Sequence, residues 1–433
     1  MTAALAAGRG GDAGDLGSLI QAAHVPPLLT VPGEDVTLRY AIVCPAPGGD
    51  LLSGRPCDAS GTVYIRPGQA GPFTMLSLER GDDSAQGRWF VRVPPAIAAD
   101  PAGFSYYAVL RNDATGDVLT LPAAGAAAPQ RSLQLGAPAA IDLGVHGFGR
   151  VRRRDARVVG ADWGGDPGEV GVSNERGAGR IGPSSFDVDR RGRVTVLDQV
   201  NRRLLRWQGA RTTAIRLRYA TGLADMALGR DGSIYVLDAT RKPTLRVLRA
   251  DGRQRSARAI AERTWAQLRV GPQGPVVQSV PSEQWMPVGN SVHLLAREAQ
   301  ARRARSGRLL ADGTEMVVLR VGADELRVAT VAAGVVQSGW RIVSRTPLGE
   351  VQLAERVGNR VVVVLKTYTD TQDEFVVLVL DGKGVSRQFS LASAQWTETA
   401  PLARFRLVGS SLYQLGSTPA GLFVDRFDLE VTQ

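Results

Sequence analysis

Histidine, cysteine and lysine are scarce in this sequence of 433 residues, which contains three histidines, two cysteines and three lysines. The histidines, His24, His146 and His293, stand far apart, with no pair at metal-ligand spacing and no serine or cysteine nucleophile signature beside them. Enzymes built on a zinc site or on a histidine-activated nucleophile are therefore not indicated. We assign no catalytic, metal-binding or cofactor-binding residue, and we predict no cofactor.

Long apolar runs are also missing. No stretch of 18 apolar residues occurs, so we predict no membrane-spanning helix. Residues 1–7 lack a basic segment before their apolar positions, and as written they do not form a signal peptide. We expect residues 1–30 to be a flexible extension in front of the first folded domain.

The two cysteines, Cys44 and Cys57, lie thirteen positions apart and flank a loop between Pro45 and Pro56. A disulfide between them would close a short loop and, in the loop-entropy model, stabilise the fold by about 3 kcal/mol. The alternative is a pair of free thiols in a reducing compartment. Together with the domain types described below, the pair favours the cell envelope or the extracellular space as the location, with the cytoplasm as the alternative.

Positive charge is in excess, with 52 lysines and arginines against 42 acidic residues and a net charge of +10. Residues 1–140 contain 9 basic and 12 acidic side chains, a net of −3, whereas residues 141–433 contain 43 and 30, a net of +13. Nearly all of the basic residues are arginines, a bias that a GC-rich genome explains better than selection for nucleic-acid binding. From the charge we therefore infer only a weak preference of residues 141–433 for anions. The densest basic run, a candidate anion patch, consists of Arg150, Arg152, Arg153 and Arg154.

Short runs of alternating apolar and polar residues follow one another over residues 35–135. Glycine, proline and aspartate separate them, which is typical of an antiparallel β-sandwich. Residues 94–95 are both proline and end one run, and the next run contains Tyr106 and Tyr107. This order resembles bacterial immunoglobulin-like or fibronectin-type modules. The resemblance implies a β-sandwich over residues 31–140 that serves as a spacer or docking module and not as a catalytic domain.

An internal repeat organises the second half of the chain. Residues 184–198 recur as residues 224–238, and a third copy, residues 266–277, keeps the six-residue step from an apolar anchor to a glycine. The glycine supplies the positive φ that a tight turn between strands requires. A period of about 40 residues with several strands is typical of propeller blades. The apolar anchors are Phe186, Met226 and Leu268, and the turn glycines are Gly192, Gly232 and Gly274. The aspartates at the strand ends are Asp198 and Asp238.

The first copy carries a longer pattern, which consists of Pro183, Phe186, Val188, Asp189, Gly192, Val194, Val196, Asp198, Asn201, Arg203 and Leu204. This pattern resembles the blade of NHL-repeat propellers. The resemblance implies that Asp198 ends a strand and anchors the following turn by accepting hydrogen bonds from backbone amides or from Arg203. The second copy keeps Asp238 but not the turn that contains asparagine and arginine.

We therefore predict an all-β protein in which an N-terminal β-sandwich is followed by a β-propeller over residues 141–433. Copies near residues 182, 224, 266, 307, 350 and 402 indicate six blades, with five or seven as alternatives. Residues 147–179 are expected to complete one blade together with the C-terminal end of the chain. Six tryptophans, spread about one per blade, are interpreted as packing residues.

A repeat scaffold without a catalytic motif favours a non-catalytic binding or scaffold protein. The propeller face or channel mouth would contact a protein, a glycan or a small ligand, and the oligomeric state stays open. A propeller enzyme of the lyase or lactonase-like hydrolase kind, with a metal site in the channel, is the first alternative. The second is single-stranded nucleic-acid binding on the basic propeller face, although nucleic acid is not the partner that we favour.

Overall fold

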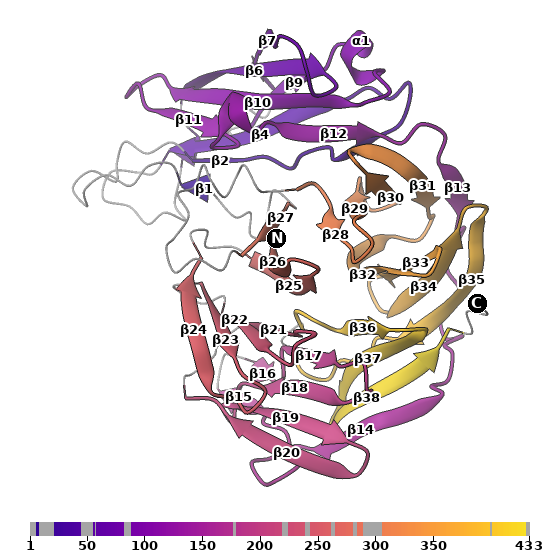
Figure 1. Cartoon of the computed structure of the whole chain (residues 1–433). Helices are drawn as coiled ribbons and strands as arrows, with labels where there is room; N and C mark the ends of the chain where they lie inside the picture. Colours follow the sequence, from indigo (N-terminus) through magenta and orange to yellow (C-terminus); the bar gives the residue numbers. More distant parts are fainter. Residues whose placement is uncertain are drawn as a thin grey trace.

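The structure is a computed structural model, and it describes residues 6–7, 21–44, 55–56, 58–81, 88–175, 179–218, 224–238, 243–260, 265–279, 284–288, 305–398 and 401–429. The described chain is all-β except for helix α1 (Pro95–Ala98) and the 3₁₀ helix Gly125–Ala127. Figure 1 shows a β-sandwich followed by a ring of small sheets, and this arrangement confirms the predicted sandwich and propeller. None of the helices in the described residues is long and apolar enough to cross a membrane.

The sandwich consists of two antiparallel sheets with one parallel pair at an edge. The first sheet has the order β1 (Ala6–Ala7), β2 (Gln21–Ala23), β4 (Thr37–Cys44), β9 (Arg88–Arg92) and β8 (Glu79–Arg80), with β5 (Arg55–Pro56) beside β4. The second has the order β3 (Leu29–Thr30), β12 (Gln130–Gln134), β10 (Phe104–Asn112), β6 (Ala59–Pro67) and β7 (Thr74–Ser77), with β11 (Val118–Leu121) beside β10. Alternate residues of β4, β6 and β10 are buried between the two sheets and form one core.

Residues 21–30 differ from the expectation of a flexible extension over residues 1–30. Strand β2 pairs with β4, and β3 pairs in parallel with β12. Ala22, Leu28 and Leu29 are almost completely buried. These strands were missed because they are two or three residues long and carry no visible alternation.

Six sheets follow one another around the propeller within the described residues, in agreement with the predicted number of blades. Blade 1 comprises β17 (Ser185–Val188), β18 (Val194–Asp198), β19 (Arg203–Gln208) and β20 (Arg211–Arg216), and blade 2 comprises β21 (Ala224–Leu228), β22 (Ile234–Asp238), β23 (Thr244–Leu248) and β24 (Gln254–Ala259). Blade 3 comprises β25 (Trp265–Gly271), β26 (Gly274–Ser279) and β27 (Trp285–Pro287). Blade 4 comprises β28 (Arg308–Leu309), β29 (Glu315–Arg320), β30 (Glu325–Ala332) and β31 (Val335–Val343), and blade 5 comprises β32 (Leu348–Val357), β33 (Arg360–Tyr368), β34 (Asp373–Asp381) and β35 (Gly384–Ala392). A hairpin of β15 (Ser173–Glu175) and β16 (Gly179–Ile181) precedes blade 1.

Blade 6 joins the two ends of the propeller. Its strands β36 (Phe405–Val408), β37 (Ser411–Thr418) and β38 (Gly421–Asp428) come from the end of the chain, whereas its outer strand, β14 (Ala156–Asp162), comes from the segment after the sandwich. Strand β14 pairs antiparallel with β38, with Val159 opposite Val424. A second early segment, β13 (Ala139–Asp142), adds a parallel fifth strand to blade 4. The expected closure of one blade by both ends of the propeller is therefore present.

The anchors of the repeat lie on the first strands of their blades. Phe186, Met226 and Leu268 are all fully buried there. Gly192 and Gly232 have φ values of +75° and +82° and lie in equivalent turns. The third copy differs: Gly274 pairs with Gly271 in the ladder, so that only residues 272 and 273 form the turn. The shorter hairpin loop moves this glycine out of the turn and into the strand.

The sandwich packs on blade 4 through an apolar cluster. Leu28, Leu29 and Leu133 of the sandwich are buried together with Val317 and Val331 of the propeller. Beside this cluster, Arg327 in β30 donates to both carboxylate oxygens of Glu34, at 2.6 and 2.8 Å. The fork-shaped guanidinium matches the carboxylate, which fixes the orientation as well as the distance.

Candidate binding site beside the propeller axis

The first strand of each blade is an edge strand that faces the propeller axis, so its backbone groups need partners outside its own sheet. Charged side chains supply them. The carboxylate of Asp187 in blade 1 accepts the backbone amide of Leu228 in blade 2 at 2.7 Å. In the same way, Asp225 of blade 2 accepts the amide of Leu268 in blade 3 at 2.7 Å. These two aspartates therefore connect blade 1 to blade 2 and blade 2 to blade 3.

Arginines from the other blades pair with the same aspartates. Arg406 of blade 6 places Nε 3.2 Å from Asp187 Oδ1, and its Nη2 donates to the carbonyl of Met226 at 2.9 Å. Arg269 of blade 3 places Nη1 3.7 Å from Asp225 Oδ2. Each first strand contributes one charged residue to this group, which we call the axial cluster: Asp187, Asp225, Arg269, Arg308, Glu355 and Arg406.

The axial cluster is balanced in charge. Arg308 pairs with Glu355 at 2.5 Å and also donates to the carbonyl of Ala354. Burial raises the pKa of Asp187 although Arg406 opposes the shift. Burial, and after it the charge of Arg406, lowers the pKa of Arg269 to about 9. Within the described residues, no three acidic, histidine or cysteine side chains are grouped so that they could hold a metal ion.

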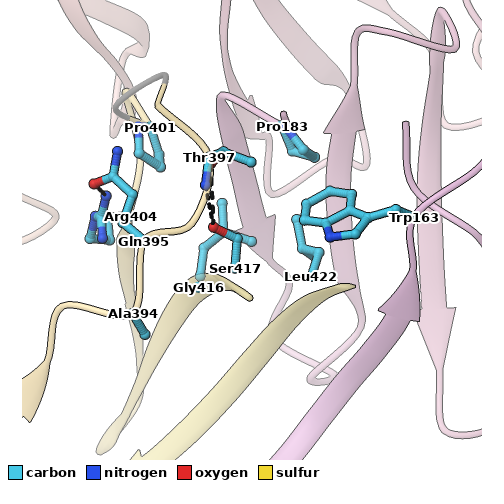
Figure 2. Close-up of a pocket in the computed structure, with 11 residues that line it drawn as sticks. Trp163, Pro183, Ala394, Gln395, Thr397, Pro401, Arg404, Gly416, Ser417 and Leu422 are labelled. Atoms are coloured by element: carbon cyan, nitrogen blue, oxygen red, sulfur yellow. Dashed lines mark hydrogen bonds between the residues drawn. The ribbon is translucent and has the colours of Figure 1, made fainter. Parts of the chain in front are cut away.

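A small, partly open pocket lies at one end of the propeller, where blades 6 and 1 meet (Figure 2), and its empty space of about 250 Å³ includes open solvent. Arg404 directly precedes β36, and Pro183 stands shortly before β17, the first strands of the two blades. A hydrogen bond of 2.7 Å from the amide of Leu402 to the carbonyl of Ser184 joins the two segments. We call this cavity the blade 6–1 pocket; it is lined by Trp163, Pro183, Ala394, Gln395, Thr397, Pro401, Arg404, Leu415, Gly416, Ser417 and Leu422.

Arg404 forms the charged wall of the pocket and is only 4% exposed. Its guanidinium donates to the carbonyl of Ser393 at 2.9 Å and to the amide oxygen of Gln395, and it lies over the ring of Phe375. Burial lowers the pKa of Arg404 to about 10, which leaves the side chain charged at neutral pH. Both hydrogen-bond acceptors are neutral, and no carboxylate in the described part of the chain lies within ion-pair distance of this guanidinium.

Trp163 and Leu422 form the opposite wall, as Figure 2 shows. The indole nitrogen of Trp163 donates to the carbonyl of Thr418 at 2.9 Å, which fixes the ring at the end of blade 6. The ring of Trp396 lies 5.6 Å from that of Trp163, and the guanidinium of Arg180 lies 4.7 Å from the ring of Trp396. Two tryptophans thus meet at this one blade end, which differs from the expected distribution of about one per blade.

Hydroxyl groups at the pocket are already engaged within the protein. Ser417 Oγ accepts the amides of Trp396 and Thr397 at 2.9 and 3.1 Å, and it also bonds Thr397 Oγ1 at 3.3 Å. These bonds hold the segment between blades 5 and 6 against β37. The hydroxyls therefore fix the wall, and Arg404, which has neutral hydrogen-bond acceptors and the more distant negative charges of Asp373 and Glu350, is the charged residue of the pocket.

The strand-end aspartate of blade 1 lies in a dense hydrogen-bond network. Asp198 is fully buried and accepts bonds from the amides of Gly171 and Asn201, from the side-chain amide of Asn201 and from Arg203 Nε at 2.8 Å. Arg203 also donates to three backbone carbonyls of residues 165–169. The network ties the turn after β18 to the segment that leads from β14. In blade 2, Asp238 also ends the second strand and is buried.

The basic run lies where the sandwich linker meets blades 5 and 6. Arg152 donates to Asp155 at 2.7 Å and to the carbonyl of Asp428 at 3.0 Å, and Arg154 lies 3.7 Å from Asp425. These contacts help to close blade 6, and the anion patch stays a prediction. Arg150 and Arg153 are exposed. Cys57 and the side chain of Cys44 lie outside the described residues, and with them the expected disulfide.

The sequence alone indicates neither the axial cluster nor Arg404. One signal was available, because Asp187, Arg269 and Arg406 each follow directly after an apolar residue that anchors a first strand. A charge at that position in three copies is unusual for a strand buried on both sides. No comparable signal marks the pocket, because Trp163, Pro183 and Arg404 come from three separate segments.

No family model matches this sequence, and no curated protein matches it significantly. Among solved structures, the chain is similar to virginiamycin B lyase from Staphylococcus aureus, with 8% identity over 59% of this chain and 96% of that chain and a TM-score of 0.36. It is also similar to the PQQ-bound aldose sugar dehydrogenase from Streptomyces coelicolor, with 7% identity over 64% and 97% of the two chains and a TM-score of 0.38. A protein of unknown function from Bacteroides thetaiotaomicron is 8% identical over 94% of this chain and 97% of its own, with a TM-score of 0.33. Likenesses this distant transfer neither an activity nor a ligand to this chain.

Proposed function

We propose that the protein is a non-catalytic binding protein whose ligand contacts the propeller at the blade 6–1 pocket. One observation carries the proposal: two neighbouring blades form a pocket, and its wall contains a buried cation whose hydrogen-bond acceptors are both neutral and whose nearest carboxylates act only from a distance. Leaving a buried charge uncompensated is costly, and proteins keep such a group mainly where function requires it.

The axial cluster supports binding over catalysis. Its carboxylates accept backbone amides of the next blade and pair with arginines, so they act as links between blades. A channel-centred metal enzyme would need carboxylates that converge on an ion instead. We further propose that the propeller is of the NHL type, that the sandwich is an immunoglobulin-like accessory module fixed on blade 4, and that the protein works in the cell envelope or outside the cell.

The proposal is tested by a thermal-shift screen of the full chain against small molecules and glycans, followed by a variant that fills the pocket. Pro401 lines the pocket and is half-buried, so Pro401→Trp should fill the cavity at little cost to folding. We expect ligands found with the wild-type chain to lose binding in this variant. Val335, which is 62% exposed on blade 4, provides the matched control Val335→Trp, which should bind as the wild type does.

Mass spectrometry of each ligand after incubation distinguishes binding from catalysis. Ligands recovered unchanged support a binding protein, whereas a converted product would favour the enzyme alternative. Ligands that bind Pro401→Trp as tightly as the wild-type chain would place the site elsewhere and contradict the proposal.

A further inference from the structure

The net positive charge of the chain comes from two of its six blades. Blades 1 and 2, residues 185–259, contain 17 basic and 7 acidic side chains, a net charge of +10, whereas the rest of the chain contains 35 of each. A genomic preference for arginine would act along the whole chain, so it does not explain a surplus that is confined to this segment. The surplus is a local property of blades 1 and 2.

Much of this charge lies on the outside of the ring. Strands β20 and β24 are the outermost strands of blades 1 and 2 (Figure 1), and each contains two arginines and no acidic residue. Further arginines are exposed in the turns that follow the first and third strands of these blades. The exposed arginines of these turns and outer strands form what we call the arginine surface: Arg190, Arg191, Arg211, Arg216, Arg230, Arg249, Arg253 and Arg255.

Contacts within and between the two blades bring these segments together. The turn before β24 lies against β20, because a side chain at Gly252 would collide with Cγ2 of Ile215. Hydrogen bonds from Ser233, and after them the charge of Arg255, lower the pKa of Asp231, which places β24 near the turn after β21. The arginines of blade 2 therefore lie near one another and beside the outer strand of blade 1.

Hardly any of these arginine side chains has a partner among the described residues. Arg253 forms the one ion pair, at 3.7 Å from Asp251, and both side chains are largely exposed. Asp231 and Asp251 each accept a backbone amide of their own turn at 3.0 Å, so turn formation explains the aspartates. Charge of either sign would protect an outer strand from pairing with another chain, so that role does not require arginine alone.

The arginine surface offers charge without exposed rings or large apolar groups. In blades 1 and 2, the described residues include no exposed large hydrophobic side chain, and Trp207 is buried. Single-stranded nucleic acid depends on aromatic rings that stack with its bases. Membrane binding gains much of its strength from apolar side chains that enter the lipid. Neither partner is therefore favoured.

The two exposed aspartates favour an acidic polysaccharide over duplex DNA. Asp231 and Asp251 stand between the arginines and repel the closely spaced phosphates of DNA. The hydroxyl groups of a sugar can instead donate to these carboxylates, while its own carboxylate groups pair with guanidinium groups in a two-pronged geometry. A polysaccharide that contains uronic acids supplies both kinds of group.

We infer that the arginine surface binds an acidic polysaccharide, with the carboxylates of the polymer on the arginines and its hydroxyl groups on Asp231 and Asp251. This inference goes beyond the proposed function, because no residue that lines the blade 6–1 pocket belongs to the arginine surface. The protein then has two separate contact surfaces on one propeller.

The test measures binding of the full chain to polygalacturonate by biolayer interferometry, with neutral dextran as the uncharged counterpart. We expect binding to polygalacturonate and none to dextran, and the affinity should fall as sodium chloride is raised, because salt screens exposed charges. A short DNA duplex, poly-dT and vesicles of anionic phospholipid represent the other partners. Tighter binding to any of these three, or equal binding to dextran, would overturn the inference.

Variants assign the binding to the arginine surface. One variant removes four of its charges, as Arg211→Gln, Arg216→Gln, Arg253→Gln and Arg255→Gln. It should weaken polygalacturonate binding about tenfold, since each exposed ion pair contributes only a small part. The matched control removes four charges at exposed positions outside blades 1 and 2, as Arg39→Gln, Arg92→Gln, Arg111→Gln and Arg345→Gln. An equal loss in both variants would show that only the net charge matters and would overturn the inference.

Circular dichroism checks the fold of each variant. If the fourfold variant does not fold, the blade 1 pair and the blade 2 pair are tested separately, and each should weaken binding about threefold. Asp231→Asn together with Asp251→Asn should lower the preference for polygalacturonate over duplex DNA, because the repulsion of phosphate is removed; an unchanged preference would overturn the role of the aspartates. Pro401→Trp should bind polygalacturonate as the wild type does, so failure of this inference and failure of the proposed function are distinguishable.

Discussion

Blade 1 and blade 6 have the same four-stranded layout but assemble it from different stretches of chain. All strands of blade 1 lie within residues 185–216, and each follows its neighbour directly. Blade 6 combines strands from residues 405–428 with β14 from residues 156–162. Local turns are enough to build blade 1, whereas blade 6 exists only after the ring has closed, and such non-local pairing carries a larger loop-closure cost.

The two blades also differ at the end that faces the blade 6–1 pocket. In blade 1 the second strand ends at Asp198, whose hydrogen-bond network fills the space beyond the strand. In blade 6 the second strand ends at Thr418, whose carbonyl accepts the indole N–H of Trp163 and whose hydroxyl donates to the carbonyl of Gly421. Both blades border the pocket, but the second strand of blade 1 ends in a hydrogen-bond network, whereas Gly416 and Ser417 near the end of the second strand of blade 6 line the pocket itself. In this molecule the pocket opens at the end of the blade where the repeat loses its pattern.

The largest expected effect concerns the anchors that the two blades share. Phe186 in β17 and Phe405 in β36 are both fully buried on the first strand of their blade. Truncating either one to alanine removes a large apolar group from a close-packed core and should lower the free energy of unfolding by about 3–5 kcal/mol. Urea denaturation of Phe186→Ala and Phe405→Ala measures both values, and Val335→Ala, at an exposed position, should cost almost nothing.

Similar losses at Phe186 and Phe405 would show that the blades are equally packed in spite of their different connectivity. A neutral Phe186→Ala would contradict the register of the whole repeat. A loss at Phe405 well below that at Phe186 would instead show that the closing blade contributes less than the structure implies.

The next effect distinguishes the ends of the two blades. Asp198→Ala removes a buried carboxylate that accepts four hydrogen bonds, from two backbone amides, one side-chain amide and the guanidinium of Arg203, and the last of these is also an ion pair. Breaking one partner of a buried pair costs about 3–5 kcal/mol, and we expect the lower part of that range because Arg203 keeps its carbonyl partners. Thermal and urea unfolding measure the loss. Asp251→Ala, with a side chain that is 56% exposed, is the control, and an equally small loss at Asp198 would mean that the network is dispensable.

The sequence predicts the features that depend on residues close together in the chain, and it does not predict those that depend on contacts between distant segments. The six-residue step from Phe186 to Gly192 and from Met226 to Gly232 reflects a strand and its turn, so the first two blades follow from it, whereas the count of six comes from the spacing of the weaker copies. Residues 21–30 could not be assigned, because their strands are too short to show a period.

The pocket could not be predicted at all from such patterns. Arg404, Trp163 and Pro183 become neighbours only because β14 and β38 pair and bring both ends of the propeller together. Nothing in the local sequence of any one of them marks this proximity. The axial cluster is an intermediate case, since its charges stand at repeat positions but their partners lie on other blades.

The smallest effect concerns the ion pair that closes blade 6. Asp425 in β38 accepts Arg157 Nε of β14 at 2.9 Å, and the side chain of Arg157 is 40% exposed. Asp425→Asn keeps an acceptor but removes the charge, and solvent screens much of the pair, so the loss should be about 1 kcal/mol or less. Because the pair is partly exposed, the difference from the wild-type chain should shrink further as salt is raised.

A loss as large as that of Asp198→Ala, unchanged by salt, would show that ring closure depends on this single pair and not on the apolar contact of Val159 with Val424 and its neighbours. We expect the opposite, because the closing strands bury a continuous apolar surface while the ion pair stays at its rim.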